Sequence, residues 1–230
     1  MSIEAQKNID LMCQEGDPRV EENDVAPTAL SKRSNYRSQS RTSSIILTRE
    51  NFSQLPTISK CLPEVTPVAS EKSKILTDAK MRVLAYHLPG GIKLSKWSLL
   101  FTPRRDGYSY LTFFKKLEDN EQTILVVKDT RGYVFGAFLT EEWHTTSNFY
   151  GDGFSFVFTF RDGDDLELYP ATGESDNYIQ SDEDGIIIGG GDDAGQRASL
   201  MLSDAFARGH SGISSCYDNT RLCSQPTTDS

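Results

Sequence analysis

The stretch TILVVKDTRGYVFGAFL at residues 123–139 decides the class of the fold. Two runs rich in β-branched and aromatic residues, at 123–129 and 133–139, flank the turn tripeptide TRG at 130–132. Short runs of this composition, separated by turn residues, are typical of paired antiparallel strands. The sequence therefore predicts a β-hairpin.

The run FSFVFTF at residues 154–160 is the strongest strand signal outside the hairpin. Side chains alternate between the two faces of a strand, so Phe154, Phe156, Phe158 and Phe160 are expected to share one face. A stripe of four phenylalanines is more typical of a core than of a ligand platform. Further short strands are predicted in LELYP, YIQ, GIIIGGG and ASLMLS, at 166–170, 178–180, 185–191 and 198–203.

Two helices and one more strand are predicted before the hairpin. Apolar residues recur at helical spacing after residue 73, with Ser73 as a possible cap and PGG at 89–91 as the stop. The run KWSLLFTP at 96–103 predicts a strand, and YSYLTFFKKLED at 108–119 predicts a short helix. The apolar positions of the two helices are Ile75, Ala79, Val83 and Tyr86 in the first and Leu111, Phe114 and Leu117 in the second.

Many short strands with few helices predict an α+β, mainly β fold, a β-sandwich of antiparallel sheets with flanking short helices. We assign this domain to residues 71–230. Residues 1–70 carry few aromatic and many polar residues, so we expect a disordered polar tail. Its basic Ser/Arg run, SKRSNYRSQSRTSS at 31–44, has two readings: a phosphorylation-controlled docking or weak membrane-surface segment, or a solvated linker.

The charge balance and the cysteines restrict the class of protein. Asp and Glu number 33 against 24 Lys and Arg, a formal net charge of -9, which argues against a nucleic-acid partner. No run approaches the roughly 20 apolar residues of a membrane span, and the N-terminus has no apolar signal-peptide core. We expect a soluble, cytoplasmic protein with no obligate oligomer. Cys13, Cys61, Cys216 and Cys223 are scattered, as is typical of reduced structural thiols.

Motifs of catalysis and metal binding are sparse. His87, His144 and His210 lie in separate segments, and neither a nucleophile elbow, a zinc-protease helix nor a phosphate-binding loop is found. The acidic runs at 162–165 and 182–185 do not have the spacing of a calcium loop, so we interpret them as solvated turns. We expect no enzyme activity, no metal and no cofactor.

Taken in order, these segments resemble a TLDc domain, the module of the oxidation resistance proteins. The hairpin motif DTRGYVFGAF at 129–138, followed by Thr140, Glu141 and Trp143, is the most specific part. The resemblance runs from about residue 73 to residue 223. The other matching segments are LP at 88–89, WSLLF at 97–101, RDGYS at 105–109, FYGDG at 149–153, TG at 172–173, NYI at 177–179, GGG at 189–191, and Ala198, Leu200, Leu202, Gly209, Ser211, Cys216, Asn219 and Leu222.

The chain also departs from the family pattern. Phe154 stands where the family usually has a Glu, and Ser203 and Ala205 replace a pair of acidic residues. The family domain ends in a further apolar strand, whereas this chain stops at SQPTTDS. We therefore expect a truncated or alternatively ended chain with an unpaired sheet edge, less stable than a chain carrying that strand.

The resemblance implies a non-enzymatic role in protection against oxidative stress, through binding and regulation of the vacuolar-type proton ATPase. The expected partners are subunits of its peripheral, ATP-hydrolysing sector, which would place some of the protein at the vacuolar or lysosomal membrane, with a mitochondrial pool left open. The candidate contacts lie in loops at 104–107, 141–143, 151–153 and 189–193. The residues are Arg104, Arg105, Gly107, Glu141, Trp143, Gly151, Gly153, Gly189, Gly190 and Gly191.

Alternative readings remain for these residues and for the function. Trp143 is either the anchor of the interface or a partly buried structural residue, and the glycines are candidates for turns that backbone geometry requires. A rival function is an enzyme or scavenger that reduces peroxide, with Cys216 or Cys223 oxidised in turnover. Reactive thiols usually lie beside His or several basic residues, and Arg221 is the only basic neighbour of these two cysteines in the sequence. A third is a membrane-trafficking adaptor that uses the basic tail.

Overall fold

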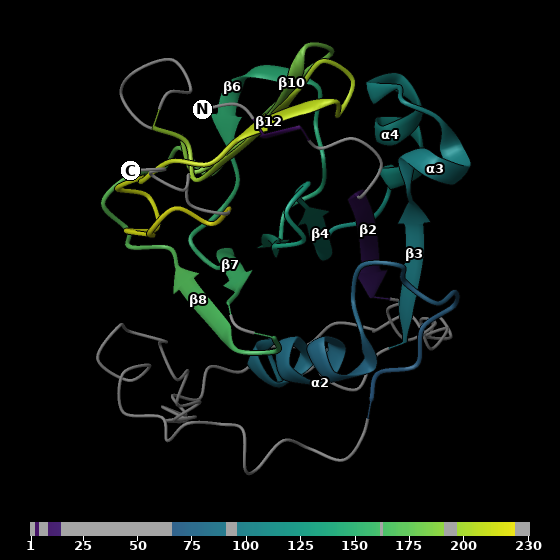
Figure 1. Cartoon of the computed structure of the whole chain (residues 1–230). Helices are drawn as coiled ribbons and strands as arrows, with labels where there is room; N and C mark the ends of the chain where they lie inside the picture. Colours follow the sequence, from purple (N-terminus) through teal and green to yellow (C-terminus); the bar gives the residue numbers. More distant parts are fainter. Residues whose placement is uncertain are drawn as a thin grey trace, which may run out of the picture.

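The computed structural model describes residues 3–4, 9–14, 66–90, 96–161, 163–190 and 197–223. They form two antiparallel sheets of six strands each, packed face to face, with three short helices at the margins (Figure 1). This arrangement confirms the predicted β-sandwich. None of the described helices is long and apolar enough to cross a membrane.

The central sheet contains the predicted hairpin and has the strand order β3-β2-β4-β5-β7-β8. The outer sheet has the order β1-β12-β11-β10-β9-β6. The strands of the central sheet are β2 Ile9–Gln14, β3 Trp97–Phe101, β4 Thr123–Lys128, β5 Val134–Leu139, β7 Phe156–Phe160 and β8 Leu166–Pro170. Those of the outer sheet are β1 Ile3–Glu4, β6 Thr146–Tyr150, β9 Ile179–Ser181, β10 Gly185–Ile188, β11 Leu200–Ser203 and β12 Arg208–His210.

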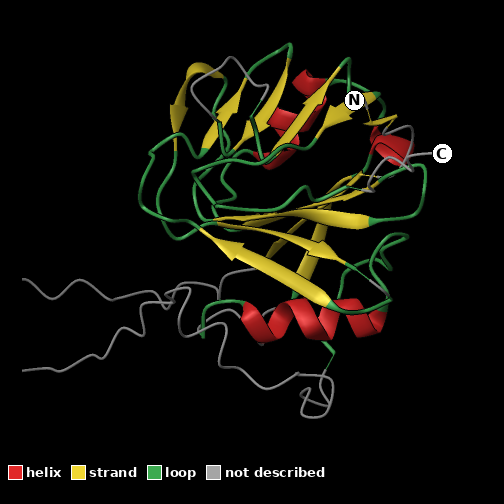
Figure 2. Cartoon of the chain, turned by 60° about the vertical axis from the view of Figure 1, so that its left-hand side comes forward, coloured by secondary structure: helices red, strands yellow, loops and turns green. Residues whose placement is uncertain are grey.

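Both faces of the central sheet are covered by other elements. Side chains on either face of the hairpin strands are therefore buried, which explains why apolar residues do not alternate with polar ones there. Leu125 and Val127 face the outer sheet, where they pack in one cluster with Ile186 and Leu200. The neighbouring residues of β4 belong to a second cluster on the opposite face, beneath helix α2, Asp78–His87 (Figure 2). Each β4 residue from Thr123 to Val127 is fully buried as a result.

Helix α2 begins later than the sequence predicted. Its N-cap is Thr77, whose side chain accepts a hydrogen bond from the Lys80 N–H. Ser73 caps a preceding turn instead, and its hydroxyl accepts from the N–H groups of Ile75 and Leu76. Ile75 is therefore buried outside the helix, and the predicted start at residue 73 is wrong.

The second predicted helix is correct in position but not in orientation. It corresponds to α4, Tyr110–Leu117; the short helix α3, Pro103–Asp106, which precedes it, was not predicted. Tyr110, Phe113 and Leu117 of α4 face the core, whereas the side chain of Leu111 is 76% exposed. Leu117 is buried as predicted, but the prediction that Leu111 faces the core is wrong, and Tyr110 and Phe113 take the core positions instead.

The four-phenylalanine stripe is also shorter than expected. Phe156, Phe158 and Phe160 are buried between the central sheet and α2. Phe154 is 78% exposed, because β7 begins only at Phe156 and the preceding residues form a turn. Phe154 is a surface residue, and the prediction that it belongs to the core is wrong.

The N-terminal region contributes two strands that the sequence analysis did not predict. Strand β1 pairs with β12, and β2 lies between β3 and β4. Residues 3–4, 9–14 and 66–70 of the expected polar tail are described, and Ala69 bridges to Trp97. The rest of residues 1–70 lies outside the described residues, so the expectation of disorder there stays a prediction. The alternation of Ile9, Leu11 and Cys13 with other residues was the overlooked signal. The Ser/Arg run at 31–44 lies outside the described residues.

Candidate functional site

Three of the four predicted loops lie against one another. The Thr140 hydroxyl donates a hydrogen bond to Asp152 Oδ1, and the His144 N–H donates to the Tyr150 hydroxyl at 3.0 Å. The loops at 141–143 and 151–153 are thereby joined. The Gly189 N–H donates to the Tyr178 carbonyl at 2.8 Å, and Tyr178 also packs beside the loop at 151–153.

Trp143 is a core residue in this structure. Its side chain is 5% exposed, and its Nε1–H donates to Thr123 Oγ1 at 2.9 Å. Its ring meets the ring of Phe113 edge to face, with 5.1 Å between the centroids. The burial of Trp143 favours the structural alternative over the interface anchor. Glu141, two residues earlier, is partly exposed.

The candidate glycines lie where packing and backbone geometry require them. A Cβ on Gly190 would come within 2.1 Å of the Phe149 ring. Gly189 has a φ of 65°, and a Cβ there would meet Ser199 Oγ at 2.5 Å. Gly107, Gly151 and Gly153 lie in the turns before α4 and β7, and Gly191 lies outside the described residues.

The fourth predicted loop belongs to a basic and apolar surface at the α3–α4 corner, which follows β3 directly (Figure 1). Tyr108 and Leu111 expose 45% and 76% of their side chains. Leu111 and Lys115 are one helical turn apart and therefore lie on the same side of α4. We call this surface the α3–α4 patch; it consists of Arg104, Arg105, Tyr108, Leu111, Lys115 and Lys116, all exposed.

Asp106 holds two of these cations in place. Its carboxylate accepts from Arg105 Nε at 2.9 Å, from Lys116 Nζ at 3.0 Å and from the Thr102 N–H at 2.9 Å. Burial alone would raise the pKa of Asp106, but the hydrogen bonds from Arg105, the Thr102 N–H and Lys116 outweigh it and lower the pKa to about 2. Asp106 therefore stays ionised and fixes the geometry of the corner.

The remaining cations of the patch are available to a partner. Within the described part of the chain, Arg104 and Lys115 form no ion pair with a carboxylate. Arg105, in contrast, also pairs with Glu71 at 2.7 Å and donates to the Leu100 carbonyl at 2.8 Å. The patch thus combines two fixed cations, two unpaired cations and two exposed apolar side chains on a protein that is acidic as a whole.

Helix α4 connects this patch to the loop at 141–143. The Asp119 N–H, just beyond the C-terminal end of α4, donates to Glu142 Oε1 at 2.9 Å. The opposite side of α4 contacts Trp143 through Phe113. The patch and the acidic loop are therefore neighbours on one continuous surface.

The sequence analysis missed three exposed apolar residues near the predicted loops. Leu111 was expected to face the core, and Tyr108, which precedes α4, was assigned to neither the core nor the surface. Phe154 was placed in the core, although its departure from the family's Glu was a signal that this position differs. Its N–H donates to Asp152 Oδ1 at 3.0 Å, which fixes the turn that presents it.

The two C-terminal cysteines are unsuited to peroxide chemistry. Both are buried, and neither forms a disulfide among the described residues. Burial, reinforced by the charge of Asp176, raises the pKa of Cys216 to about 12, and its Sγ–H points at the Ser175 carbonyl at 3.8 Å. Burial also raises the pKa of Cys223, and Arg221 offsets this only in part. A thiol must be ionised and accessible to react, and neither condition is met.

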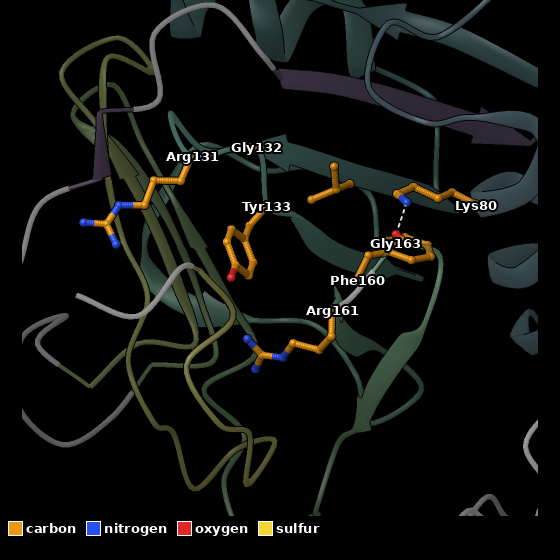
Figure 3. A pocket seen from close by; sticks show the side chains of 8 residues that line it. Lys80, Arg131, Gly132, Tyr133, Phe160, Arg161 and Gly163 are labelled. Carbon is orange, nitrogen blue, oxygen red and sulfur yellow. Dashed lines mark hydrogen bonds between the residues drawn. The ribbon is translucent and has the colours of Figure 1, made fainter. Parts of the chain in front are cut away.

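A cavity of about 260 Å³ lies between α2 and the β4–β5 turn (Figure 3). Phe160 and Tyr133 line it together with three cationic residues, Lys80, Arg131 and Arg161. Lys80 Nζ lies 4.9 Å from the Phe160 ring centre and pairs with Asp164 at 2.6 Å. Arg161 pairs with Glu167 at 3.1 Å. These carboxylates pair with two of the three cations that line the cavity.

The acidic run at 182–185 forms the turn between β9 and β10. Asp182 Oδ1 accepts hydrogen bonds from the N–H groups of Asp184 and Gly185. This carboxylate therefore stabilises the backbone of the turn. Across the described ranges, no three His, Cys, Asp or Glu side chains gather as metal ligands would.

The family model of the TLDc domain matches residues 69–229. The chain belongs to the TLDc domain family. It is 31% identical to human oxidation resistance protein 1 over 182 residues, which are 77% of this chain and 20% of that protein. It is 29% identical to human nuclear receptor coactivator 7 over 160 residues, 69% of this chain and 16% of that protein. This TLDc chain thus spans about a fifth of the length of the curated relatives it matches.

Proposed function

We propose that this TLDc chain is a non-enzymatic protein of the oxidative stress response that acts by binding another protein. The names of its oxidation resistance relatives support the stress role. The observation that carries the binding role is the α3–α4 patch, where Tyr108 and Leu111 are exposed beside four cations, of which Arg104 and Lys115 have no carboxylate partner among the described residues. Scattered apolar residues are ordinary on a surface. Here an exposed tyrosine and leucine lie beside two arginines, and aromatic residues and Arg are enriched in protein contacts.

The partner that the TLDc resemblance implies is the peripheral sector of the vacuolar-type proton ATPase. In this proposal the α3–α4 patch binds an acidic surface of one of its subunits, with Leu111 and Tyr108 in apolar contact. Opposite charges steer the approach of the two proteins and fix their orientation. Phe154 and the acidic loop at 141–143 extend the contact towards the roughly 1,200 to 2,000 Å² that a specific interface buries.

The pump contact accounts for stress protection without catalysis in this chain. The buried thiols of Cys216 and Cys223 support a binding role over a scavenging role. We place the protein in the cytoplasm, with a fraction bound at the vacuolar or lysosomal membrane through the pump.

A pull-down from cytosol and vacuolar membranes tests this function. The full chain, immobilised by a C-terminal tag, is compared with the Cys216→Ala/Cys223→Ala variant. We expect both forms to enrich subunits of the peripheral sector and to protect cells equally against peroxide. Protection lost with the cysteines, or no enrichment of the pump by either form, would contradict the proposal.

A further inference from the structure

The cavity between α2 and the β4–β5 turn is lined by charged side chains of one sign. Of the described residues that line it, the charged ones are Lys80, Arg131 and Arg161, all of them cations. Asp164 and Glu167, which pair with Lys80 and Arg161, are half exposed and are not among the described lining residues. A ligand in the cavity therefore meets cationic side chains, although the whole chain has a formal net charge of -9. This local charge favours an anion over a cation.

Hydrogen bonds fix the walls of this cavity. Lys80 Nζ donates to the carbonyl of Gly163, which joins α2 to the turn between β7 and β8. In the β4–β5 turn, Asp129 Oδ1 accepts from the Tyr133 N–H at 2.9 Å, and the Asp129 N–H donates to the Tyr133 carbonyl at 3.0 Å. A preformed site loses less conformational entropy on binding than one that must first become ordered. The cavity is therefore suited to a ligand of fixed shape.

Two side chains at the cavity have hydrogen-bond donors left over. Arg161 Nε donates to Glu167, and Arg161 Nη2 donates to the Thr220 hydroxyl and the Arg221 carbonyl. Within the described ranges, no residue accepts a hydrogen bond from Arg161 Nη1, and the Tyr133 hydroxyl has no hydrogen-bond partner either. Figure 3 shows the Tyr133 hydroxyl pointing towards the Arg161 guanidinium. A guanidinium edge and a phenol together suit the two oxygens of a carboxylate.

The rest of the described lining is aromatic or apolar. Val134 and Phe160 are buried residues of the cluster beneath α2, and each presents part of its surface to the cavity. The rings of Tyr133 and Phe160 lie on opposite sides of the space in Figure 3. Aromatic side chains favour contact with other flat rings. The lining thus fits a ligand that carries an apolar ring beside its anionic group.

The volume and the paired cations restrict the ligand further. At about 30 Å³ for each water molecule of the liquid, 260 Å³ corresponds to on the order of nine non-hydrogen atoms. This is less than the roughly 300–1,000 Å³ of pockets for drug-sized ligands. Two of the lining cations already have carboxylate partners, and these carboxylates would repel a doubly charged phosphate more than a singly charged carboxylate.

We propose that this cavity is a binding site for a small aromatic carboxylate of about the size of benzoate. The carboxylate accepts hydrogen bonds from Arg161 Nη1 and the Tyr133 hydroxyl, and the ring packs against Phe160 and Val134. The guanidinium of Arg131 points away from the other labelled side chains in Figure 3, so it contributes charge rather than contact. The site shares no residue with the α3–α4 patch and does not depend on binding to the pump.

Titration of the ¹⁵N-labelled full chain with benzoate, followed by two-dimensional NMR, tests the site. We expect saturable shifts of the backbone N–H signals of Gly132, Tyr133 and Gly163, and none at the α3–α4 patch. Benzamide keeps the shape without the charge, and acetate keeps the charge without the ring, so each should bind about tenfold more weakly or worse. Phenyl phosphate should also bind more weakly than benzoate. Equal binding of benzamide or acetate, tighter binding of phenyl phosphate, or no saturable shift at the cavity would overturn the proposal.

Matched variants test the two hydrogen-bond donors. Arg161→Gln should weaken benzoate binding about tenfold or more, whereas Arg104→Gln, with the same change of charge at the α3–α4 patch, should not. Thermal unfolding checks that the Arg161 variant folds. Tyr133→Phe keeps the ring and should weaken binding about three- to tenfold, whereas Tyr108→Phe should have no effect. Wild-type affinity in Tyr133→Phe or in folded Arg161→Gln, or an equal loss in the controls, would refute the assignment.

Discussion

The indole of Trp143 meets the ring of Phe113 edge to face at 5.1 Å, and this contact joins the loop at 141–143 to the inner side of helix α4. The outer side of the same helix carries Leu111 and Lys115 of the α3–α4 patch. A change in the buried contact is therefore expected to alter the exposed surface as well. The loop at 141–143, which the sequence analysis named as a candidate contact, therefore stabilises the helix that carries the α3–α4 patch.

Replacement of Trp143 is expected to destabilise the protein. Trp143→Ala should cost about 3–5 kcal/mol, since it leaves a large cavity beside Phe113 and removes the partner of Thr123. Urea unfolding followed by circular dichroism measures the loss. Tyr108→Ala, at the exposed patch, is the control and should leave the free energy of unfolding nearly unchanged. A Trp143→Ala protein as stable as the wild type would contradict the core assignment.

Asp106 should make the stability of the protein depend on pH in the acid range. Its folded-state pKa is lowered from 3.8 to about 2, so it contributes stability above pH 4. That contribution is lost as the pH falls from about 4 to about 2, where the folded-state carboxylate takes up its proton. The difference in urea midpoint between the wild type and Asp106→Asn should therefore be constant near neutral pH and shrink below pH 4. A difference independent of pH across this range would contradict the network.

Gly136 tests the packing of the hairpin. A Cβ at this position would lie 1.8 Å from the Leu125 carbonyl oxygen of the paired strand, so Gly136→Ala must displace β4 or β5. We expect a loss of about 1–3 kcal/mol or more, as for other overpacked cores, measured by thermal unfolding. Gly90→Ala is the matched control, because a Cβ there meets no atom within 4 Å. Equal melting temperatures of the two variants would refute the close approach.

The buried thiols should be unreactive in the folded protein. In a Cys13→Ser/Cys61→Ser background, maleimide labelling at pH 7 should be slow without denaturant and complete in urea. The reason is the pKa of Cys216, raised to about 12, together with burial of both sulfur atoms. Mass spectrometry of the labelled protein checks this. Rapid labelling of the folded protein would revive the scavenger hypothesis.

The parts of the fold that follow from local pattern were predictable. The hairpin at 123–139 combines two strand-forming runs with a turn between them, and its register spans six residue pairs as expected from that pattern. Strand β2 was missed because its partners, β3 and β4, lie more than 80 residues further along the chain. A six-residue alternation in a polar region carries no sign of such a distant pairing.

The candidate site was predictable in position but not in detail. The loops were identified through the family resemblance, and three of them do adjoin. Which residues are exposed depends on tertiary packing: Tyr110 rather than Leu111 turns inward because its ring packs on Phe206, 4.3 Å away between centroids. Trp143 is likewise buried because α4 covers it. Neither contact is visible in the sequence.

The most direct test of the central claim is the affinity of the full chain for the purified peripheral sector of the vacuolar-type proton ATPase, measured by biolayer interferometry. Arg104→Glu/Lys115→Glu is compared with Lys128→Glu/Arg131→Glu, which makes the same change in net charge near the β4–β5 turn. We predict that the wild type and the control bind alike and that the patch variant binds roughly tenfold more weakly or worse, with wild-type affinity falling as salt rises. Equal binding by all three proteins, or no binding by the wild type, would contradict the account.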